Sequence, residues 1–288
     1  MQNNTPTTRI QDTLVAVKGA GDLASGVMHR LARAGFAVMA TELAEPTVVR
    51  RTVSFAEAVM QESMTVEGVT ARRADSLAEI KTISAQGMIP VAIDPDGVML
   101  RALHPTVLIE ATLSKHNTGV TMNDAPIVIA LGPGYEAGKD VHAVIETNRG
   151  HNLGRVYLEG CAEANTGVPG AIGGYTSERL LKAPAAGTFY GVRQIGDLAQ
   201  AGETVAVVRT SDGHDALVLA AIGGIVRGLL RDGLHVSAGM KVGDIDPRAA
   251  REHCFTISDK SRAVAGGALE AILYFRKTLA YAAHFGLS

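Results

Sequence analysis

Tryptophan is absent from this chain of 288 residues, and phenylalanine and tyrosine together bring the aromatic content to only 4%. So few aromatic rings argue against a surface that stacks the bases of single-stranded nucleic acid. The formal net charge is −2, and lysine and arginine are scattered along the chain. Because nucleic-acid-binding domains gather positive charge in a stripe or patch, we expect no nucleic-acid partner.

Cysteine is also scarce, since Cys161 and Cys254 are far apart and form no C-x-x-C motif. This spacing fits neither a disulfide framework nor a zinc site, so we expect no bound metal and a cytoplasmic location. Long apolar runs are missing as well. The longest, Ala216–Leu230, is too short to span a membrane and contains Arg227. Residues 1–12 are polar and lack a signal-peptide core, which predicts a flexible tail.

Glycine and apolar residues are plentiful, and the clearest motif combines them in Leu14–Gly26, LVAVKGAGDLASG. An apolar run ends in a glycine turn, and apolar residues then recur at helical spacing. Gly19, Gly21 and Ala24 match the G-x-G-x-x-G/A pattern of dinucleotide-binding turns. Glu42 lies 23 positions beyond Gly19, near the separation of about 20 expected for an acid that holds ribose hydroxyls.

Asp22 favours a different interpretation of this turn. A carboxylate has no obvious use beside a diphosphate, but it can cap the following helix and fill the anion site with its own oxygen. The sequence therefore leaves two alternatives open. The turn binds a phosphorylated ligand, with Lys18 close to the phosphate, or it is a structural link between strand and helix.

Short apolar runs alternate with helical or loop segments from residue 13 to about 160, which predicts a Rossmann-like domain with a mostly parallel sheet. Polar residues and glycines follow these runs at Lys18–Gly21, Glu42, Asp94, Glu110–Thr112, Gly132–Gly134 and Glu146–His151. Ligands of such sheets bind at the carboxyl ends of the strands. Turns favour glycine and aspartate in any case, but Glu110, Glu146 and Arg149 are not turn formers. Arg50 and Arg51, on a predicted helix, are further candidates for an anion, or surface residues paired with nearby acids.

An internal repeat occupies the second half, because residues 183–208 align with 220–245 without a gap, with four glycines in register. Two interlocking copies predict a small all-β module over residues 181–248. The pattern resembles the barrel-sandwich hybrid of lipoyl and biotinyl carrier domains, although another small barrel stays open. The turn at Thr210–Asp215 has no lysine, so we expect no lipoate or biotin and a docking or packing role.

The C-terminal segment, residues 249–288, contains a predicted helix from Arg262 to about Ala283, with a broad apolar face. Gly266 and Gly267 would weaken an isolated helix, so we expect close packing on the α/β domain. Residues 161–180 connect that domain, over 13–160, to the β module. The predicted fold class is α/β, with a Rossmann-like domain, a lipoyl-like module and a C-terminal helix.

Two side chains are candidates for catalysis. A Cys254 thiolate would carry sulfur or selenium if His253 and the start of the following helix lowered its pKa. The alternative is a buried, inert thiol. His151 lies beside Arg149 and titrates near neutral pH, although a lone histidine more often serves as a hydrogen-bonding residue. No nucleophile–base motif is visible.

Five stretches together resemble the YqeB-type accessory proteins of selenium-dependent molybdenum hydroxylases, over residues 13–276. They are KGAGDLASG (18–26), TELAEPTVVRRTVSFAEAV (41–59), DAPIVIALGPGYEAGKDVHAVIETNRGHNLGRV (124–156), NTGVPGAIGGYTSERLL (165–181) and GDIDPRAAREHCFTISDKSRAVAGGALEAIL (243–273). The xanthine dehydrogenase accessory factors are a more distant likeness. The resemblance implies a maturation protein that helps to load or modify molybdopterin, with a molybdenum hydroxylase as client.

The resemblance also adds Gly26 to the glycine loop. The predicted cofactor-binding residues are therefore Lys18, Gly19, Gly21, Asp22, Gly26, Glu42, Gly132, Gly134, Glu146, Asn148 and Arg149, and the catalytic candidates are Cys254 and His151. The expected ligand is molybdopterin or a nucleotide. An NAD(P)-dependent oxidoreductase and a non-catalytic adaptor are the alternatives. The sequence leaves open whether the chain is an enzyme, whether it handles sulfur or selenium, and whether it forms a homo-oligomer.

Overall fold

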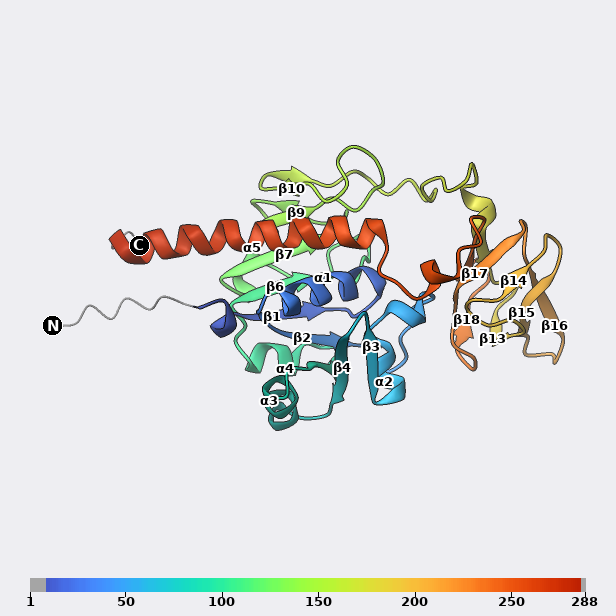
Figure 1. The fold of residues 1–288 in the computed structure, drawn as a ribbon, viewed down its shortest axis with the longest axis horizontal. Helices are drawn as coiled ribbons and strands as arrows, with labels where there is room; N and C mark the ends of the chain where they lie inside the picture. The colour runs from blue at the N-terminus through green and yellow to red at the C-terminus, as the bar shows by residue number, and fades with distance from the viewer. Residues whose placement is uncertain (1–8, 286–288) are drawn as a thin grey trace.

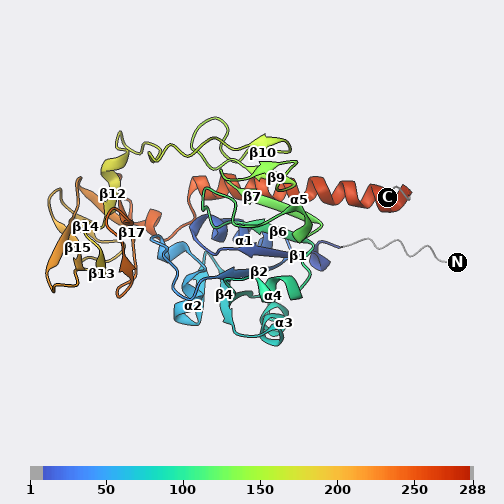
Figure 2. The same ribbon diagram turned by 180° about the vertical axis from the view of Figure 1, so that it is seen from behind.

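The computed structural model describes the backbone of residues 9–285 and the side chains of residues 9–277. Figure 1 shows a large α/β domain beside a smaller β module, and Figure 2 shows the same arrangement from behind. The predicted tail lies mostly outside the described residues, and its last part forms a 3₁₀ turn over Ile10–Asp12. In the described part of the chain, no helix is long and apolar enough to cross a membrane.

The α/β domain is built on one nine-stranded sheet in the order β10-β9-β7-β6-β1-β2-β5-β4-β3. Its strands are β1 Leu14–Lys18, β2 Ala37–Glu42, β3 Ser63–Val66, β4 Val69–Ala74, β5 Ile89–Ile93, β6 Val107–Glu110, β7 Ile127–Leu131, β9 Ala143–Ile145 and β10 Val156–Tyr157. All neighbouring pairs are parallel except the two edge pairs, β3 with β4 and β10 with β9. The mostly parallel sheet predicted from the sequence is therefore confirmed.

Alternate strand residues face two separate cores, as the two-residue period of a strand requires. Val15 and Val17 pack under the helices α1 (Asp22–Arg33) and α5 (Asp259–Phe285), whereas Ala16 faces α3 (Leu77–Ala85) and α4 (Val98–Ala102). The remaining short elements are α2 (Glu57–Gln61), the strands β8 (Glu136–Ala137) and β11 (Gly160–Cys161), and the 3₁₀ turns Arg51–Val53, Met122–Asp124, Ser177–Arg179 and Arg251–Cys254. Helices thus cover both faces of the sheet.

The predicted strand, glycine turn and helix are confirmed by the backbone. The segment LVAVKGAGDLASG forms β1, a turn and the start of α1, with Gly19 at a φ of 95° that suits glycine. A β-carbon on Gly19 would also lie 3.2 Å from the backbone of Ala111. Glu67 and Gly68 have positive φ and link β3 to β4 as a two-residue hairpin.

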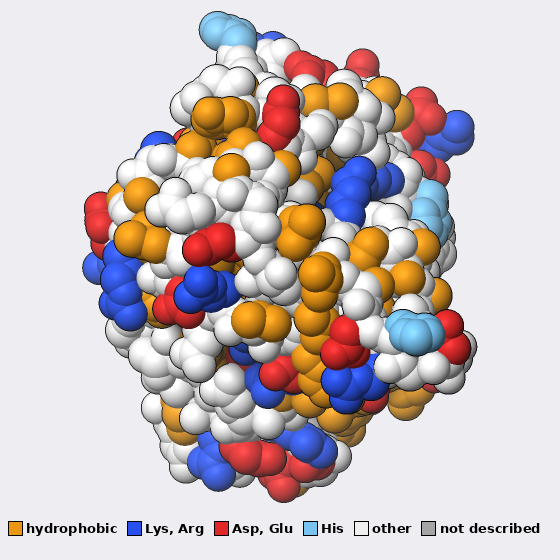
Figure 3. All heavy atoms as spheres, turned by 90° about the vertical axis from the view of Figure 1, so that its right-hand side faces the viewer, with side chains coloured by type: hydrophobic (Ala, Val, Ile, Leu, Met, Phe, Trp, Pro, Cys, Tyr) orange, Lys and Arg blue, Asp and Glu red, His pale blue; other side chains and the backbone are white. Residues whose placement is uncertain are grey.

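The β module consists of two four-stranded antiparallel sheets that enclose one apolar core. One sheet has β12 (Leu180–Lys182), β19 (Lys241–Asp246), β17 (Gly224–Leu229) and β14 (Leu198–Ala199), and the other has β16 (Asp215–Leu219), β15 (Thr204–Arg209), β13 (Gly187–Gly191) and β18 (His235–Val236). Figure 3 shows hydrophobic side chains interspersed with charged ones on the face turned toward the viewer. The exposed large hydrophobic residues of the module include Leu198, Leu217 and Leu219.

The internal repeat is visible strand by strand. Strands β13, β14 and β15 correspond to β17, β18 and β19 at the offset of 37 residues, and equivalent strands lie in opposite sheets. The matching glycines are needed for the same reason in both copies. A β-carbon on Gly187 would overlap the carbonyl oxygen of Arg209, and one on Gly224 would lie 2.5 Å from that of Asp246. The two units therefore interlock around equivalent contacts.

The long helix α5 packs lengthwise on α1, as Figure 1 shows. It begins at Asp259, three residues before the predicted start. Gly267 lets α5 also approach the loop between β9 and β10, because a β-carbon there would overlap the carbonyl oxygen of Gly154. Ile272 and Val264 are fully buried in the core between α5 and the sheet.

The segment after β2 joins the two parts. The N–H of Leu229 on β17 donates to the carbonyl of Val49 at 2.7 Å, and Arg51 Nε donates to the carbonyl of Leu229 at 2.8 Å. Arg231 and Arg51 both pair with the buried carboxylate of Glu57. The predicted helix at Arg50 and Arg51 is reduced to the 3₁₀ turn Arg51–Val53, because its backbone pairs with the β module instead.

Candidate functional site

A cleft of about 720 Å³ lies between the carboxyl edge of the nine-stranded sheet and the β module. Its lining comes from the start of α1, from the loops after β2, β6, β7 and β9, from the start of α5, and from β17 and β19. Residues 163–170 of the connector form a further wall. Open parallel sheets bind ligands at this edge, and the volume falls within the range of about 300–1,000 Å³ typical of ligand pockets.

Positive charge dominates this lining. Seven of its residues are lysine or arginine: Arg50, Lys115, Arg149, Arg179, Arg227, Lys241 and Lys260. Only Asp22, Glu163 and Asp244 are acidic, which leaves an excess of four positive charges in a chain whose formal net charge is −2. We call this space the basic cleft.

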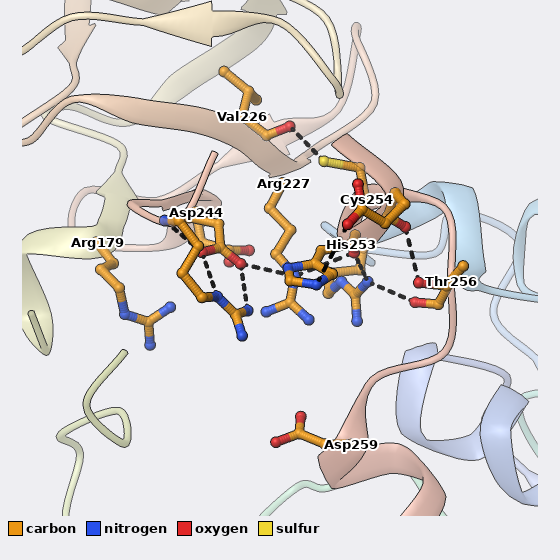
Figure 4. Close-up of polar contacts among 12 residues, drawn as sticks. Arg179, Val226, Arg227, Asp244, His253, Cys254, Thr256 and Asp259 are labelled. Atoms are coloured by element: carbon orange, nitrogen blue, oxygen red, sulfur yellow. Dashed lines mark hydrogen bonds and ion pairs between the residues drawn. The ribbon is translucent and has the colours of Figure 1, made fainter. Parts of the chain in front are cut away.

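Three of these arginines are buried, with 7% of Arg50, 6% of Arg179 and 7% of Arg227 exposed. Their closest partners include backbone carbonyls, which accept hydrogen bonds without cancelling charge. Arg50 donates to the carbonyls of His253 at 2.9 Å and Thr256 at 3.2 Å, and Arg179 donates to that of Gly170 at 3.0 Å. Figure 4 shows Arg227 of β17, and Arg179 of the 3₁₀ turn before β12, extending toward Asp259 at the start of α5.

The buried arginines repel one another. Burial lowers the pKa of Arg50 and of Arg179, and the charge of Arg227 lowers both further, against the opposing effect of nearby aspartates. Among the described residues, Nε of Arg50 and Nε of Arg179 have no hydrogen-bond partner. A buried cation that is incompletely paired is costly, and an anion in the basic cleft would relieve this cost.

The acids near the basic cleft only partly balance these cations. Asp246 forms an ion pair with Arg227, with Oδ2 3.7 Å from Nε. Both carboxylate oxygens of Asp246 also accept hydrogen bonds from Arg248, at 2.9 and 2.6 Å. Burial opposes ionisation of Asp246, yet the hydrogen bonds from Arg248 lower its pKa, so the carboxylate is charged. Asp22 lies 3.7 Å from Arg50.

The glycine loop differs from the predicted site in its use of Glu42. One oxygen of Glu42 accepts the N–H of Ala20 at 2.8 Å, and the other accepts that of Leu43 at 2.8 Å. The carboxylate that was expected to hold ribose is thus engaged within the turn. Asp22 makes no capping hydrogen bond, because Gly21 is the N-cap and the Asp22 carboxylate faces Arg50.

Several predicted glycines serve packing. A β-carbon on Gly26 would overlap Oγ of Ser261 on α5, so this glycine lets the two helices approach. On Gly132 it would lie 2.6 Å from Oγ1 of Thr147, and on Gly134 2.6 Å from the backbone nitrogen of His116. These glycines shape the loops around Pro133, which does line the basic cleft.

The polar run after β9 reaches the basic cleft through Thr147, Asn148 and Arg149. Glu146 is fully buried and accepts the N–H groups of Asn148 at 2.7 Å and Glu163 at 2.8 Å, so it anchors the connector. Arg149 makes two hydrogen bonds to Asp259 at 2.7 and 2.8 Å. Lys18, by contrast, donates to Thr118 Oγ1 at 3.2 Å and does not line the cleft.

The two catalytic candidates lie outside the basic cleft. Cys254 is fully buried, with its thiol 3.7 Å from the carbonyl of Val226 (Figure 4). Burial raises the pKa of this thiol, so the expectation that His253 and the helix start would lower it is wrong. His151 is exposed. Over the described residues, no group of three histidine, cysteine, aspartate or glutamate side chains could hold a metal ion.

Sequence reasoning missed Arg179, Arg227 and Lys260. One signal was present for Arg227, which interrupts the longest apolar stretch of the chain. An arginine in such a stretch is expected to be buried and to have a specific partner or role. No comparable pattern marks Arg179 or Lys260, because their proximity depends on how the β module packs.

Fold and site together define an α/β protein with a β module and a basic cleft between them. The chain is 50% identical over 260 residues to the "Uncharacterized protein YqeB" of Escherichia coli (strain K12). The resemblance to YqeB-type proteins is thereby confirmed. The aligned region covers 90% of this chain and 47% of the relative, so the chain spans about half the length of that curated protein.

Other comparisons add little. No protein-family model matches the chain. A succinylglutamate desuccinylase/aspartoacylase from Rhodobacter sphaeroides has a TM-score of 0.26 and 16% identity, with 81% of this chain and 84% of that one covered. A structure described as TcdA (CsdL) has a TM-score of 0.31 and 14% identity, with 93% and 89% covered. These scores are too low to support an argument about fold or activity.

Proposed function

We propose that this protein binds a phosphorylated cofactor, molybdopterin or a nucleotide, in the basic cleft. The observation that carries the proposal is the set of buried arginines Arg50, Arg179 and Arg227, which face the cleft without full neutralisation. Phosphate oxygens accept several charge-assisted hydrogen bonds at once and suit arginine better than a single carboxylate does. A cleft of 720 Å³ accommodates a whole cofactor rather than one phosphate ion.

The proposed biological role is that of an accessory protein in the cytoplasm that helps to load or modify the cofactor of a selenium-dependent molybdenum hydroxylase. The relation to YqeB-type proteins supports this role, and the basic cleft supplies a place for the cofactor. In this role the cofactor is cargo, and the client hydroxylase is the partner. The chain's own residues would bind and orient the cofactor.

We further propose that the α/β domain is Rossmann-like and that the β module is lipoyl-like but lacks a carrier lysine. The strand order β5-β2-β1-β6-β7-β9, with all pairs parallel, supports the first assignment. The interlocked repeat supports the second, and the turn between β15 and β16 contains no lysine. The module contributes Arg227 to the basic cleft in place of a swinging arm, and the 3₁₀ turn just before β12 contributes Arg179.

The NAD(P)-dependent oxidoreductase is the less favoured alternative, because the carboxylate of Glu42 already binds the backbone of the glycine turn. A non-catalytic adaptor would need no ligand at all. A binding experiment therefore separates the adaptor, which would bind no ligand, from the proposal. Release of molybdopterin would also separate the proposal from the oxidoreductase, which would bind NAD or NADP.

The test is native mass spectrometry of gently purified protein, followed by identification of small molecules released on denaturation. We expect molybdopterin or a nucleotide in stoichiometric amount. Arg179→Met should reduce this occupancy at least tenfold, whereas Arg209→Met, which alters an exposed arginine of the same module outside the basic cleft, should not. An empty protein that also ignores added NAD, NADP and inorganic pyrophosphate in calorimetric titrations would refute the proposal and favour the adaptor.

A further inference from the structure

Lys260 is the second residue of α5 and lines the basic cleft. Within the described part of the chain its ammonium group makes no hydrogen bond or ion pair, and Asp22 and Glu146 act on it only through their charge. Other lysines nearby are engaged, since Lys18 donates to Thr118 and Lys241 lies 3.8 Å from Asp244. Lys260 is therefore an uncommitted amine inside a site that is already rich in positive charge.

Several elements surround this amine. Burial contributes most and lowers the pKa of Lys260, and the charges of Arg149, after β9, and Lys241, on β19, lower it further. Asp22 on α1 and the buried Glu146 act in the opposite direction, but the resulting pKa is still below its ordinary value. The first turn of a helix also disfavours a cation, because the helix dipole is positive there.

The lowered pKa makes the neutral form of this amine easier to reach than that of an ordinary surface lysine. A lysine that is desolvated and next to other cations is a recognised form of activated nucleophile. The surrounding Arg50, Arg149 and Arg179 would hold the anionic part of a ligand, and the ligand's remaining atoms would lie in the same cleft as the amine.

We propose that Lys260 is a nucleophilic amine that condenses with an aldehyde or ketone carbonyl of an anionic ligand in the basic cleft. This inference rests on the proposed function, because it needs the cleft to bind an anion. It adds a second class of ligand for the basic cleft beside molybdopterin and nucleotides, which carry no aldehyde or ketone, namely a phosphorylated or carboxylated carbonyl compound.

The reaction needs no oxidant or reductant. The nitrogen lone pair of Lys260 forms a bond to the carbonyl carbon as the C=O π bond breaks, and a proton moves from nitrogen to oxygen to give a carbinolamine. The hydroxyl group then leaves as water with one added proton, and the remaining N–H proton is lost as the C=N bond of the imine forms. Asp22 lines the same cleft and supplies a carboxylate for these proton transfers.

Pyridoxal phosphate is a suitable probe, because it carries an aldehyde and a phosphate. The full-length protein is incubated with the probe near neutral pH, imines are trapped with borohydride, and labelled peptides are identified by mass spectrometry. We expect Lys260 to be labelled several-fold faster than the exposed Lys182. Inorganic pyrophosphate should protect Lys260 alone, and pyridoxal without phosphate should lose the preference.

Lys260→Arg keeps the positive charge and removes the nucleophile. This variant should still bind pyrophosphate in a calorimetric titration but should lack the fast label. The preference for Lys260 over Lys182 should be small at strongly alkaline pH, where both amines are unprotonated, and larger near neutral pH, since an amine of lowered pKa stays unprotonated to a lower pH. Equal labelling of Lys260 and Lys182, with pyrophosphate binding intact, would overturn this inference and leave the proposed function standing. If the wild-type protein does not bind pyrophosphate at all, the proposed function would instead be refuted.

Discussion

At the scale of single residues, the carboxylate of Asp259 shows how the start of α5 is held at the basic cleft. Two hydrogen bonds from Arg149 hold the pKa of Asp259 well below its ordinary value, although partial burial opposes this effect. The pair crosses from the loop after β9 to the helix that carries Lys260. One ion pair thus fixes the relative position of two walls of the cleft.

Arg149→Met should lower the free energy of unfolding by at most about 1 kcal/mol at pH 7, because 71% of the Asp259 side chain is exposed and solvent screens the pair. A lowered pKa in the folded state stabilises above the unfolded pKa, roughly 3.9, and this contribution disappears as the pH falls toward the folded value. Denaturant unfolding of both proteins between pH 7 and pH 2 measures the difference, which should shrink in the acid range.

Asp259→Asn is the matched control for this effect. In that background, Arg149→Met should no longer change the pH dependence of unfolding, because the titrating partner is gone. A difference between wild type and Arg149→Met that stays constant down to pH 2 would show that packing, rather than charge, accounts for it.

At the scale of elements, close backbone contact decides how α5 packs. Gly26 on α1 faces Ser261, and Gly267 on α5 faces the backbone of Gly154 and the side chain of Ile145. Neighbouring Gly266 is different, because the closest atom to an added β-carbon would be the end of the Arg30 side chain at 3.4 Å. A larger residue is therefore excluded at Gly267 by close backbone contact, whereas the space at Gly266 can accept one.

Gly267→Ala should destabilise the protein by about 1–3 kcal/mol, because the added methyl group has no space and α5 must shift. Gly266→Ala should stabilise it by up to about 1 kcal/mol, since alanine is the better helix former and the Arg30 side chain can move. Thermal or denaturant unfolding of the two variants measures both effects. If both changes had the same sign, the predicted contact between α5 and the Gly154 loop would be incorrect.

At the scale of the whole molecule, the basic cleft exists only because the β module is fixed against the α/β domain. Glu57 is central to this contact, because its carboxylate, 3% exposed, pairs with Arg231 of the module and with Arg51 of the joining segment. Removing its charge would leave two arginines without their shared partner.

Glu57→Gln should lower the free energy of unfolding by about 2 kcal/mol. This is less than the roughly 3–5 kcal/mol typical of fully buried pairs, because both arginines are 26% exposed. Glu203 pairs with Arg193 and is more exposed than Glu57. Glu203→Gln should therefore lower the free energy of unfolding by less than about 1 kcal/mol. Denaturant unfolding measures both variants. Equal losses would mean that Glu57 does not help to hold the module.

Much of the fold was predictable because its signals are local. The pattern of β1, turn and α1 follows from strand and helix periods that meet at Gly19 and Gly21, and the hairpin at Glu67-Gly68 follows from turn chemistry. The repeat at an offset of 37 residues indicated that one unit cannot bury its apolar face alone and must pack against the other. The site was less predictable, because Glu42, Gly26 and Glu146 have hydrogen-bonding or packing partners that no local pattern reveals.

The sequence by itself determined the strands, the helices and the glycine positions of this protein, since backbone sterics and hydrophobic periodicity act over a few residues. It also carried the relation to YqeB-type proteins. Only the tertiary structure decided that Arg50, Arg179, Arg227 and Lys260 line one cleft, and that Cys254 is buried with a raised pKa. Charge and burial act through space, so they depend on residues that the chain brings together from more than 200 positions apart.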